Sequence, residues 1–139
     1  MSCPISNYLR ITSSKDTFET IVNLLVDEVR EETTYSKFWP APEGLNEKED
    51  YEWCMENYQC TKGICATVDR AKQTIYFETN FDPATLIVER LAKLFPDTGI
   101  EYSYDMYDNN THEITDTYEN GTLVDHQDVV FEEDEEYDD

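Results

Sequence analysis

The order in which the hydrophobic period of this chain switches between two and 3.6 residues restricts its fold more than any other feature. Residues 5–12 alternate between apolar and polar side chains, which is typical of a half-buried strand. Ser13 or Ser14 can cap the helix that follows. The apolar side chains of this helix keep helical spacing and predict one inward-facing stripe: Phe18, Ile21, Val22, Leu25, Val26 and Val29.

The next segment, residues 35–62, has a mixed pattern. Two prolines in FWPAPEGL (38–45) fix φ and remove hydrogen-bond donors, so this part is predicted to be extended and rich in turns. Residues 47–58 predict a short acidic helix, and its inward face is expected to carry Tyr51, Cys54, Met55 and Tyr58.

Three further strands are predicted before position 108. Residues 64–69 and 74–79 predict two strands joined by a basic turn at 70–72, and residues 99–107 alternate again. Between the strands at 74–79 and 99–107, Asp82-Pro83 combines a helix cap with a proline suited to the first helical position. Pro96 ends this helix, whose inner stripe is predicted to be Ile87, Leu91, Leu94 and Phe95.

The order strand, helix, strand, strand, helix, strand predicts an α+β fold, namely a ferredoxin-like split β-α-β sheet with two helices on one face. Residues 112–118 and 122–131 then surround Asn120-Gly121, a strong signal for a two-residue β-hairpin. We therefore expect one domain over residues 1–131, with the hairpin as a C-terminal extension. Residues 132–139 contain seven acidic side chains and one tyrosine, and they are predicted to form a disordered acidic tail.

Acidic side chains are concentrated in the C-terminal third of the chain. Asp and Glu total 32 against 10 Lys and Arg, which gives a formal net charge of -22. Sixteen of the acidic residues follow Lys93, and no Lys or Arg does. A field of this sign repels nucleic acid and anionic membranes and attracts basic protein surfaces. We therefore expect no direct binding to nucleic acid or to membranes.

Neither a targeting segment nor a membrane span is predicted. Residues 1–11 lack a basic region followed by a long apolar run, and no apolar stretch approaches the length that crosses a bilayer. The cysteines are then expected to be free thiols in a reducing cytoplasm: Cys3, Cys54, Cys60 and Cys65.

A series of motifs in the middle of the chain resembles a known family. WCMENY (53–58), followed by Thr61-Lys62, is similar to the Trp-Cys-x-x-Asn-Trp-Gly-Thr-Lys signature of the Api92-like (YubB) ferredoxin-like family. The resemblance covers about residues 5–107. Its flanking motifs occur in the family's order: NYLRI (7–11), WPAP (39–42), FET (77–79), Asp82-Pro83 and Phe95-Pro96.

This resemblance implies a fold and a setting rather than a chemistry. Members of the family are found on bacteriophages, plasmids and genomic islands, which implies the cytoplasm of a bacterial host cell. Their biochemical role is mostly unassigned, so the resemblance supplies no catalytic residue. Tyr58-Gln59-Cys60 stands where the family has Trp-Gly, and Gly63 stands where a second Trp is usual. An aromatic pocket of the family would therefore be remodelled in this chain.

Cysteine and histidine side chains are compatible with chemistry other than protein binding. Cys54, Cys60 and Cys65 suggest a three-thiolate zinc site, but structural zinc sites usually pair ligands two to four residues apart. Buried small apolar side chains are a better account of these cysteines. His112 and His126 lie among carboxylates, as an acid–base pair would, but no nucleophile motif or glycine-rich phosphate loop accompanies them.

Four residues loosely suggest a calcium loop: Asp105, Asp108, Asn110 and Asp116. The spacing and the central glycine of an EF-hand are missing. We therefore expect no metal, no cofactor and no enzymatic activity.

Acidic mimicry of DNA is the leading functional hypothesis. Carboxylates on one face of a strand recur about every 7 Å, a spacing comparable to that of the phosphates along a DNA strand. The net charge also far exceeds the magnitude of about 2–8 typical of a small soluble domain. The predicted phosphate surrogates are Asp105, Asp108, Glu113, Asp116, Glu119, Asp125 and Asp128, extended by Glu132, Glu133, Asp134, Glu135 and Glu136, with added contact area from Tyr102, Tyr104 and Tyr107.

On this hypothesis, the chain is a phage or mobile-element accessory protein. It would occupy the basic groove of a host nucleic-acid-binding defence protein, such as a restriction enzyme, a CRISPR effector or a repair nuclease. A second hypothesis keeps the fold without the mimicry. The sheet would then pair with a partner or with a second copy as a non-enzymatic interaction module or homodimer, and the acidity would serve solubility.

Overall fold

The computed structural model describes residues 5–80, 82–107 and 111–131 of the chain, and the predicted tail lies outside them. One antiparallel sheet has the strand order β2-β3-β4-β5-β1-β6-β7-β8. Its strands are β1 (Ile5–Thr12), β2 (Val26–Asp27), β3 (Glu32–Thr33), β4 (Ile64–Asp69), β5 (Thr74–Thr79), β6 (Gly99–Tyr107), β7 (Thr111–Glu119) and β8 (Thr122–Phe131). The helices are α1 (Lys15–Leu25), α2 (Glu47–Asn57) and α3 (Thr85–Leu94).

The predicted α+β class is confirmed, but the predicted ferredoxin-like split β-α-β sheet with two helices is wrong. The described chain has an eight-stranded sheet and three helices. Part of the difference arises between α1 and β4, where the chain forms β2, β3 and α2. Strands of two residues are too short to carry a hydrophobic period, so the sequence pattern gives no sign of β2 or β3.

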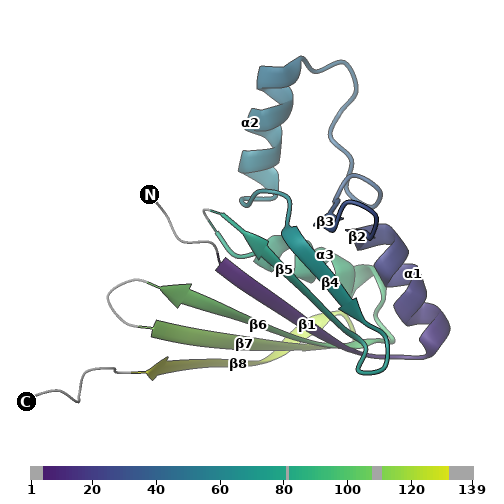
Figure 1. The fold of residues 1–139 in the computed structure, drawn as a ribbon, viewed down its shortest axis with the longest axis vertical. Coiled ribbons are helices and arrows are strands. Elements are labelled where there is room, and N and C mark those ends of the chain that lie inside the picture. Colours follow the sequence, from purple (N-terminus) through teal and green to yellow (C-terminus); the bar gives the residue numbers. More distant parts are fainter. Residues whose placement is uncertain (1–4, 81, 108–110, 132–139) are drawn as a thin grey trace, which may run out of the picture.

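The layers of the molecule are visible in Figure 1, in which α1 and α3 lie on the same side of the sheet and α2 projects away from it. The core therefore lies between the sheet and the helices α1 and α3, whose apolar faces are buried.

None of these three helices in the described part of the chain is long and apolar enough to cross a membrane.

Helix α1 forms where predicted but is shorter. Ser14 is its N-cap, and the Ser14 hydroxyl accepts a hydrogen bond from the Thr17 N–H at 3.1 Å. The helix ends at Leu25, and the chain then turns into β2. Val29, predicted to continue the inward stripe, is 95% exposed because it lies beyond the end of the helix.

Helix α3 begins two residues later than its Asp82-Pro83 signal suggests, with Ala84 as its N-cap. Its buried residues are Ile87, Val88, Leu91 and Ala92. The stripe is thus rotated relative to the prediction, and Leu94 is 49% exposed.

Helix α2 is held at its start by a capping box, in which the Asn46 side chain accepts from the Glu49 N–H at 2.8 Å. No residue of α2 is fully buried, and Tyr51, predicted to face inward, is 58% exposed. Contacts come from an aromatic cluster of Trp39, Trp53 and Tyr58, whose rings meet edge to face at 5.2–6.4 Å. The family-like WCMENY motif therefore attaches α2 to the rest of the domain.

A buried polar network joins the centre of the sheet to α3. The Asn7 side chain donates to Thr79 Oγ1 at 3.0 Å and to two backbone carbonyls at 3.1 and 3.4 Å. Its Oδ1 accepts from the Ala84 N–H at 3.2 Å and from the Tyr102 hydroxyl. The Ala84 N–H also donates to Tyr102 Oη at 2.8 Å. One amide side chain thus links β1, β5, β6 and the start of α3.

Strand β1 lies inside the sheet, although it comes first in the sequence. Ser6 pairs with Glu78 of β5, and Asn7 pairs with Tyr104 of β6. In contrast, β6, β7 and β8 follow one another directly, and the turn between β7 and β8 has positive φ values of 54° at Asn120 and 78° at Gly121. The predicted hairpin at this turn is confirmed.

Candidate functional site

The face of the sheet opposite α1 and α3, which we call the open face, carries no helix in the described parts of the chain (Figure 1). Side chains that are paired across neighbouring strands point to the same face, so the register determines which of them lie at one level. Three rows result, of which two are paired continuously from β5 to β8, whereas the third is paired from β6 to β8 and, separately, from β5 to β1.

The first row contains two carboxylates. Arg10 pairs with both Thr74 and Glu101, Glu101 pairs with Thr117, and Thr117 pairs with Asp125. We call this set the Glu101 row. Glu101 and Asp125 are both exposed.

The second row, the Glu113 row, contains three carboxylates. Asp105 of β6 pairs with Glu113 of β7, which pairs with Val129 of β8. Ser6 and Glu78 pair with each other on β1 and β5 at the same end of the open face. Asp105 and Glu113 thus carry like charges directly opposite each other on neighbouring strands, an arrangement that is unfavourable in a sheet unless other groups offset it.

A neutral row separates the two acidic ones. This hydroxyl row consists of Tyr76, Tyr8, Ser103, Thr115 and Gln127. The Ser103 and Thr115 hydroxyls are 3.0 Å apart, and the Tyr76 hydroxyl donates to Glu78 at 2.8 Å. Burial is the main cause that raises the pKa of Tyr76, so this phenol stays neutral at physiological pH.

The spacing of the two acidic rows follows from strand geometry. Glu101 and Asp105 are four residues apart on β6, which places the rows about 13 Å from each other. Within the Glu101 row, Glu101 and Asp125 are two strands apart, or about 10 Å. Two parallel lines of negative charge at this separation are comparable to the phosphate rows that border the DNA major groove, which is about 12 Å wide.

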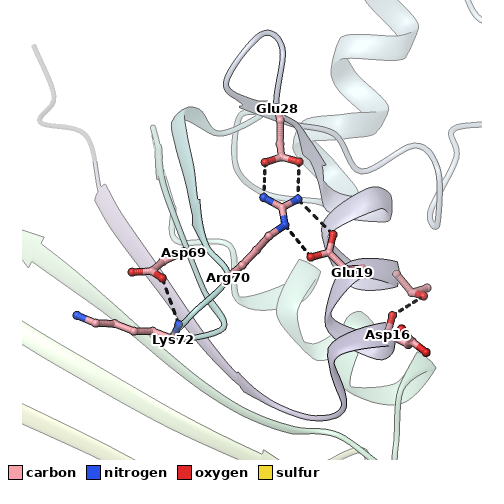
Figure 2. Close-up of polar contacts among 7 residues, drawn as sticks. Asp16, Glu19, Glu28, Asp69, Arg70 and Lys72 are labelled. Carbon is pink, nitrogen blue, oxygen red and sulfur yellow. Dashed lines mark hydrogen bonds and ion pairs between the residues drawn. The ribbon is translucent and has the colours of Figure 1, made fainter.

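Basic side chains border the open face at one corner. A hollow of about 940 Å³ extends over the sheet, and its lining includes Arg10, Lys72, Tyr8, Tyr76, Glu101 and Glu113. Figure 2 shows the Lys72 side chain, from the β4–β5 turn, extended away from the neighbouring Arg70 cluster. Arg10 therefore places positive charge within the Glu101 row, directly opposite Glu101, and Lys72 adds positive charge at the same corner of the open face.

Arg70, in the same turn, contributes to the fold and not to the open face. Its guanidinium lies between Glu19 of α1 and Glu28 of the β2–β3 turn, at 2.6 and 2.8 Å (Figure 2). Hydrogen bonds from Arg70 are the main cause that lowers the pKa of the Glu28 carboxyl. This cation is thus engaged by two carboxylates of its own chain.

The predicted phosphate surrogates are divided between the two faces of the sheet. Asp105, Glu113, Glu119 and Asp125 occupy alternating positions that point to the open face. Asp116 and Asp128 point to the opposite face, on which α1 and α3 lie. Six predicted surrogates lie outside the described residues: Asp108, Glu132, Glu133, Asp134, Glu135 and Glu136.

Asp116 in particular does not fit the predicted role. It is only 4% exposed, and its carboxylate forms a short hydrogen bond with Nδ1 of His126, its cross-strand neighbour. Strand alternation explains this placement, because Asp116 is two residues from the buried Tyr118 and points the same way. For the same reason Tyr102, expected to add contact area for a partner, is fully buried, and burial raises its pKa well above the ordinary value.

The metal alternatives gain no geometric support. Asp105 and Asp116 point to opposite faces, so they do not share a calcium loop, and Asp108 and Asn110 lie outside the described residues. Among the residues described, no three His, Cys, Asp or Glu side chains are grouped as metal ligands. Cys60 is buried, and burial raises the pKa of its thiol to about 11, whereas Cys65 is exposed.

Sequence reasoning missed Glu101 and Glu78 as members of the acidic rows. Glu101 alternates with Asp105 along β6, so the period of two contains the signal that it shares a face with Asp105. Glu78 is brought to the same face by pairing between β1 and β5, which no local pattern reveals.

Comparisons of the whole chain with family models, curated proteins and solved structures found no match. The resemblance to the Api92-like family therefore stays a prediction from the quoted motifs.

Proposed function

We propose that this chain is a non-enzymatic protein that binds the cationic nucleic-acid-binding groove of another protein and thereby blocks that groove. The open face and its two acidic rows form the contact surface. On this proposal the rows act as substitutes for two lines of DNA phosphates, with the hydroxyl row between them in the place of the groove floor.

The observation that carries the proposal is the register of β6, β7 and β8, which aligns exposed and half-buried carboxylates in two rows on the open face of the sheet. The pairing of Asp105 with Glu113 supports it further, because it places two carboxylates of neighbouring strands side by side on the open face. Helix-side residues such as Asp116 play no part in this contact.

The biological setting rests on the sequence resemblance and is part of the proposal. A phage or mobile-element accessory protein in the cytoplasm of a bacterial host would meet defence proteins that bind DNA or RNA. Restriction enzymes, CRISPR effectors and repair nucleases present basic grooves of the required kind.

Competition with DNA tests this function. A panel of purified bacterial nucleases of these classes is incubated with labelled duplex DNA and increasing amounts of the chain. We expect displacement of DNA from at least one of them, with an affinity that falls steeply as salt is raised. The triple variant Glu101→Gln, Glu113→Gln, Asp125→Asn should weaken the competition roughly 3- to 160-fold, from about 0.2–1 kcal/mol for each charge removed.

A matched variant separates the arrangement of charge from its amount. Glu47→Gln, Glu52→Gln, Glu56→Gln removes the same three charges from exposed positions on α2. This variant should compete almost as well as the unmodified chain. Equal losses in the two triple variants would mean that net charge, and not the open face, governs binding, and the proposal would then be wrong.

A further inference from the structure

We propose that β8 is the docking edge for an extended basic segment of the partner protein, which adds to the sheet as a further strand beside β8. This inference rests on the proposed function, because it specifies how the partner of the open face is held.

The two edges of the sheet are built differently. At one edge, β2 and β3 have two residues each, and very short edge strands are a common protection against unwanted strand pairing. At the other edge, β8 has ten residues and a length of about 33 Å. No strand pairs with its outer side in the described ranges. Its outward backbone N–H and C=O groups can therefore pair with an added strand.

The side chains of β8 give only part of the usual protection of an edge. Its sequence, TLVDHQDVVF, contains no lysine or proline, although it carries Asp125, Asp128 and a β-bulge opposite Thr117 and Tyr118. Four apolar side chains of β8 are 45–53% exposed: Leu123, Val124, Val129 and Val130. Leu123 and Val124 lie near one end of the strand and Val129 and Val130 near the other, so an added strand would cover both pairs.

The acidic charge near β8 indicates which kind of segment would bind along this edge. Asp125, which lies between the two apolar pairs of β8, is exposed on the open face. The fitting segment therefore has lysine or arginine near its middle and β-branched apolar residues toward its ends. A second copy of this chain fits less well, because each copy carries a formal net charge of -22 and would bring further carboxylates to the contact.

Peptide binding to the full chain tests the edge. The probe is a peptide of about eight residues with lysines in its middle and valines toward both ends, and the control is the same peptide N-methylated at every backbone nitrogen. The control keeps the charge and the side chains but donates no backbone hydrogen bond. We expect at least tenfold tighter binding of the unmodified peptide. We also expect at least tenfold slower amide exchange in β8, measured by NMR.

A variant separates strand addition from simple attraction. Val124→Glu with Val129→Glu adds negative charge at the edge while removing the apolar contacts. Peptide binding should weaken about fivefold or more, although the variant is more acidic. Tighter binding, equal binding of the two peptides, protection at β2 and β3 instead of β8, or dimerisation of the chain through β8 would each overturn the inference.

The outcomes for the edge and for the open face are distinguishable. The open-face triple variant is read out by DNA competition, whereas the edge is read out by exchange of the β8 amides. Loss of competition in the triple variant, without β8 protection by the peptide, would overturn the edge inference alone. Protection of β8, with competition unaffected by the triple variant, would overturn the open-face function alone.

Discussion

Removing the hydroxyl group of Tyr102 tests the buried network at the centre of the sheet. Tyr102→Phe deletes an oxygen that accepts from the Ala84 N–H at 2.8 Å and donates to Asn7 Oδ1. The ring stays in place, and the Ala84 N–H keeps its bond to Asn7 at 3.2 Å. Because no donor is left wholly unsatisfied, the loss should be that of about one buried hydrogen bond, or about 1–2 kcal/mol of unfolding free energy.

Asn7→Ala removes more hydrogen bonds than Tyr102→Phe does. The Asn7 side chain takes part in five hydrogen-bond contacts, and the residue is fully buried. Its removal leaves buried polar partners on β5, β6 and the start of α3 without this amide. We expect a loss of about 3–5 kcal/mol, which is in the range reserved for broken buried networks.

Urea unfolding measures both effects, with far-UV circular dichroism and the fluorescence of Trp39 and Trp53 as probes. In thermal unfolding, about 1 kcal/mol should correspond to about 3–5 °C for a chain of this size. The double variant should lose less than the sum of the single losses, because both side chains belong to one network. Equal losses in the two single variants, or strict additivity, would refute the role assigned to Asn7.

Three further predictions concern pH, salt and packing. Burial raises the pKa of Cys60 to about 11 and the pKa values of Tyr58 and Tyr118 to about 12. Because the unfolded chain loses these protons at a lower pH than the folded chain, the urea concentration at the midpoint of unfolding should fall as the pH rises from about 9 to 12. A constant midpoint over that range would contradict this. Raising NaCl from about 0.01 to 0.5 M should raise the melting temperature, because salt screens the repulsion among the acidic residues after Lys93. A lower melting temperature at high salt would contradict a net repulsion among these residues. Gly63→Ala should cost about 1–3 kcal/mol in urea unfolding, because its Cβ would lie 2.5 Å from the buried Phe77 ring, and an unchanged stability would show that the ring can move aside.

Local patterns predicted most elements correctly. The strands at 64–69 and 74–79 coincide with β4 and β5, and Asn120-Gly121 forms the hairpin turn. These elements depend on interactions between residues close in sequence, such as turn chemistry and alternation along one strand. Contacts between segments far apart in the sequence could not be predicted in this way. The width of the sheet and the projection of α2 depend on such contacts, because they follow from pairing and packing between distant segments.

The sequence directed attention to the acidic residues of the candidate site but not to their geometry. The concentration of acids after Lys93 falls on β6, β7 and β8. Charge alone does not state which face a carboxylate occupies, so Asp116 was grouped with Glu113 although their side chains point in opposite directions. Strict use of the period of two would have separated them and added Glu101. The rows themselves depend on the register between strands, which is fixed only when the sheet forms.

The central position of β1 affects the order in which the protein can form during synthesis. β1 is made first, but Asn7 needs Tyr104, which emerges from the ribosome about 5–20 s later at ordinary rates of translation. The β6–β7–β8 meander, by contrast, joins neighbours and can close quickly once made. A nascent chain that ends before β6 therefore presents β1 with an unpaired side. We expect chaperones that shield unpaired strands to act on this protein mainly before its acidic third has been translated.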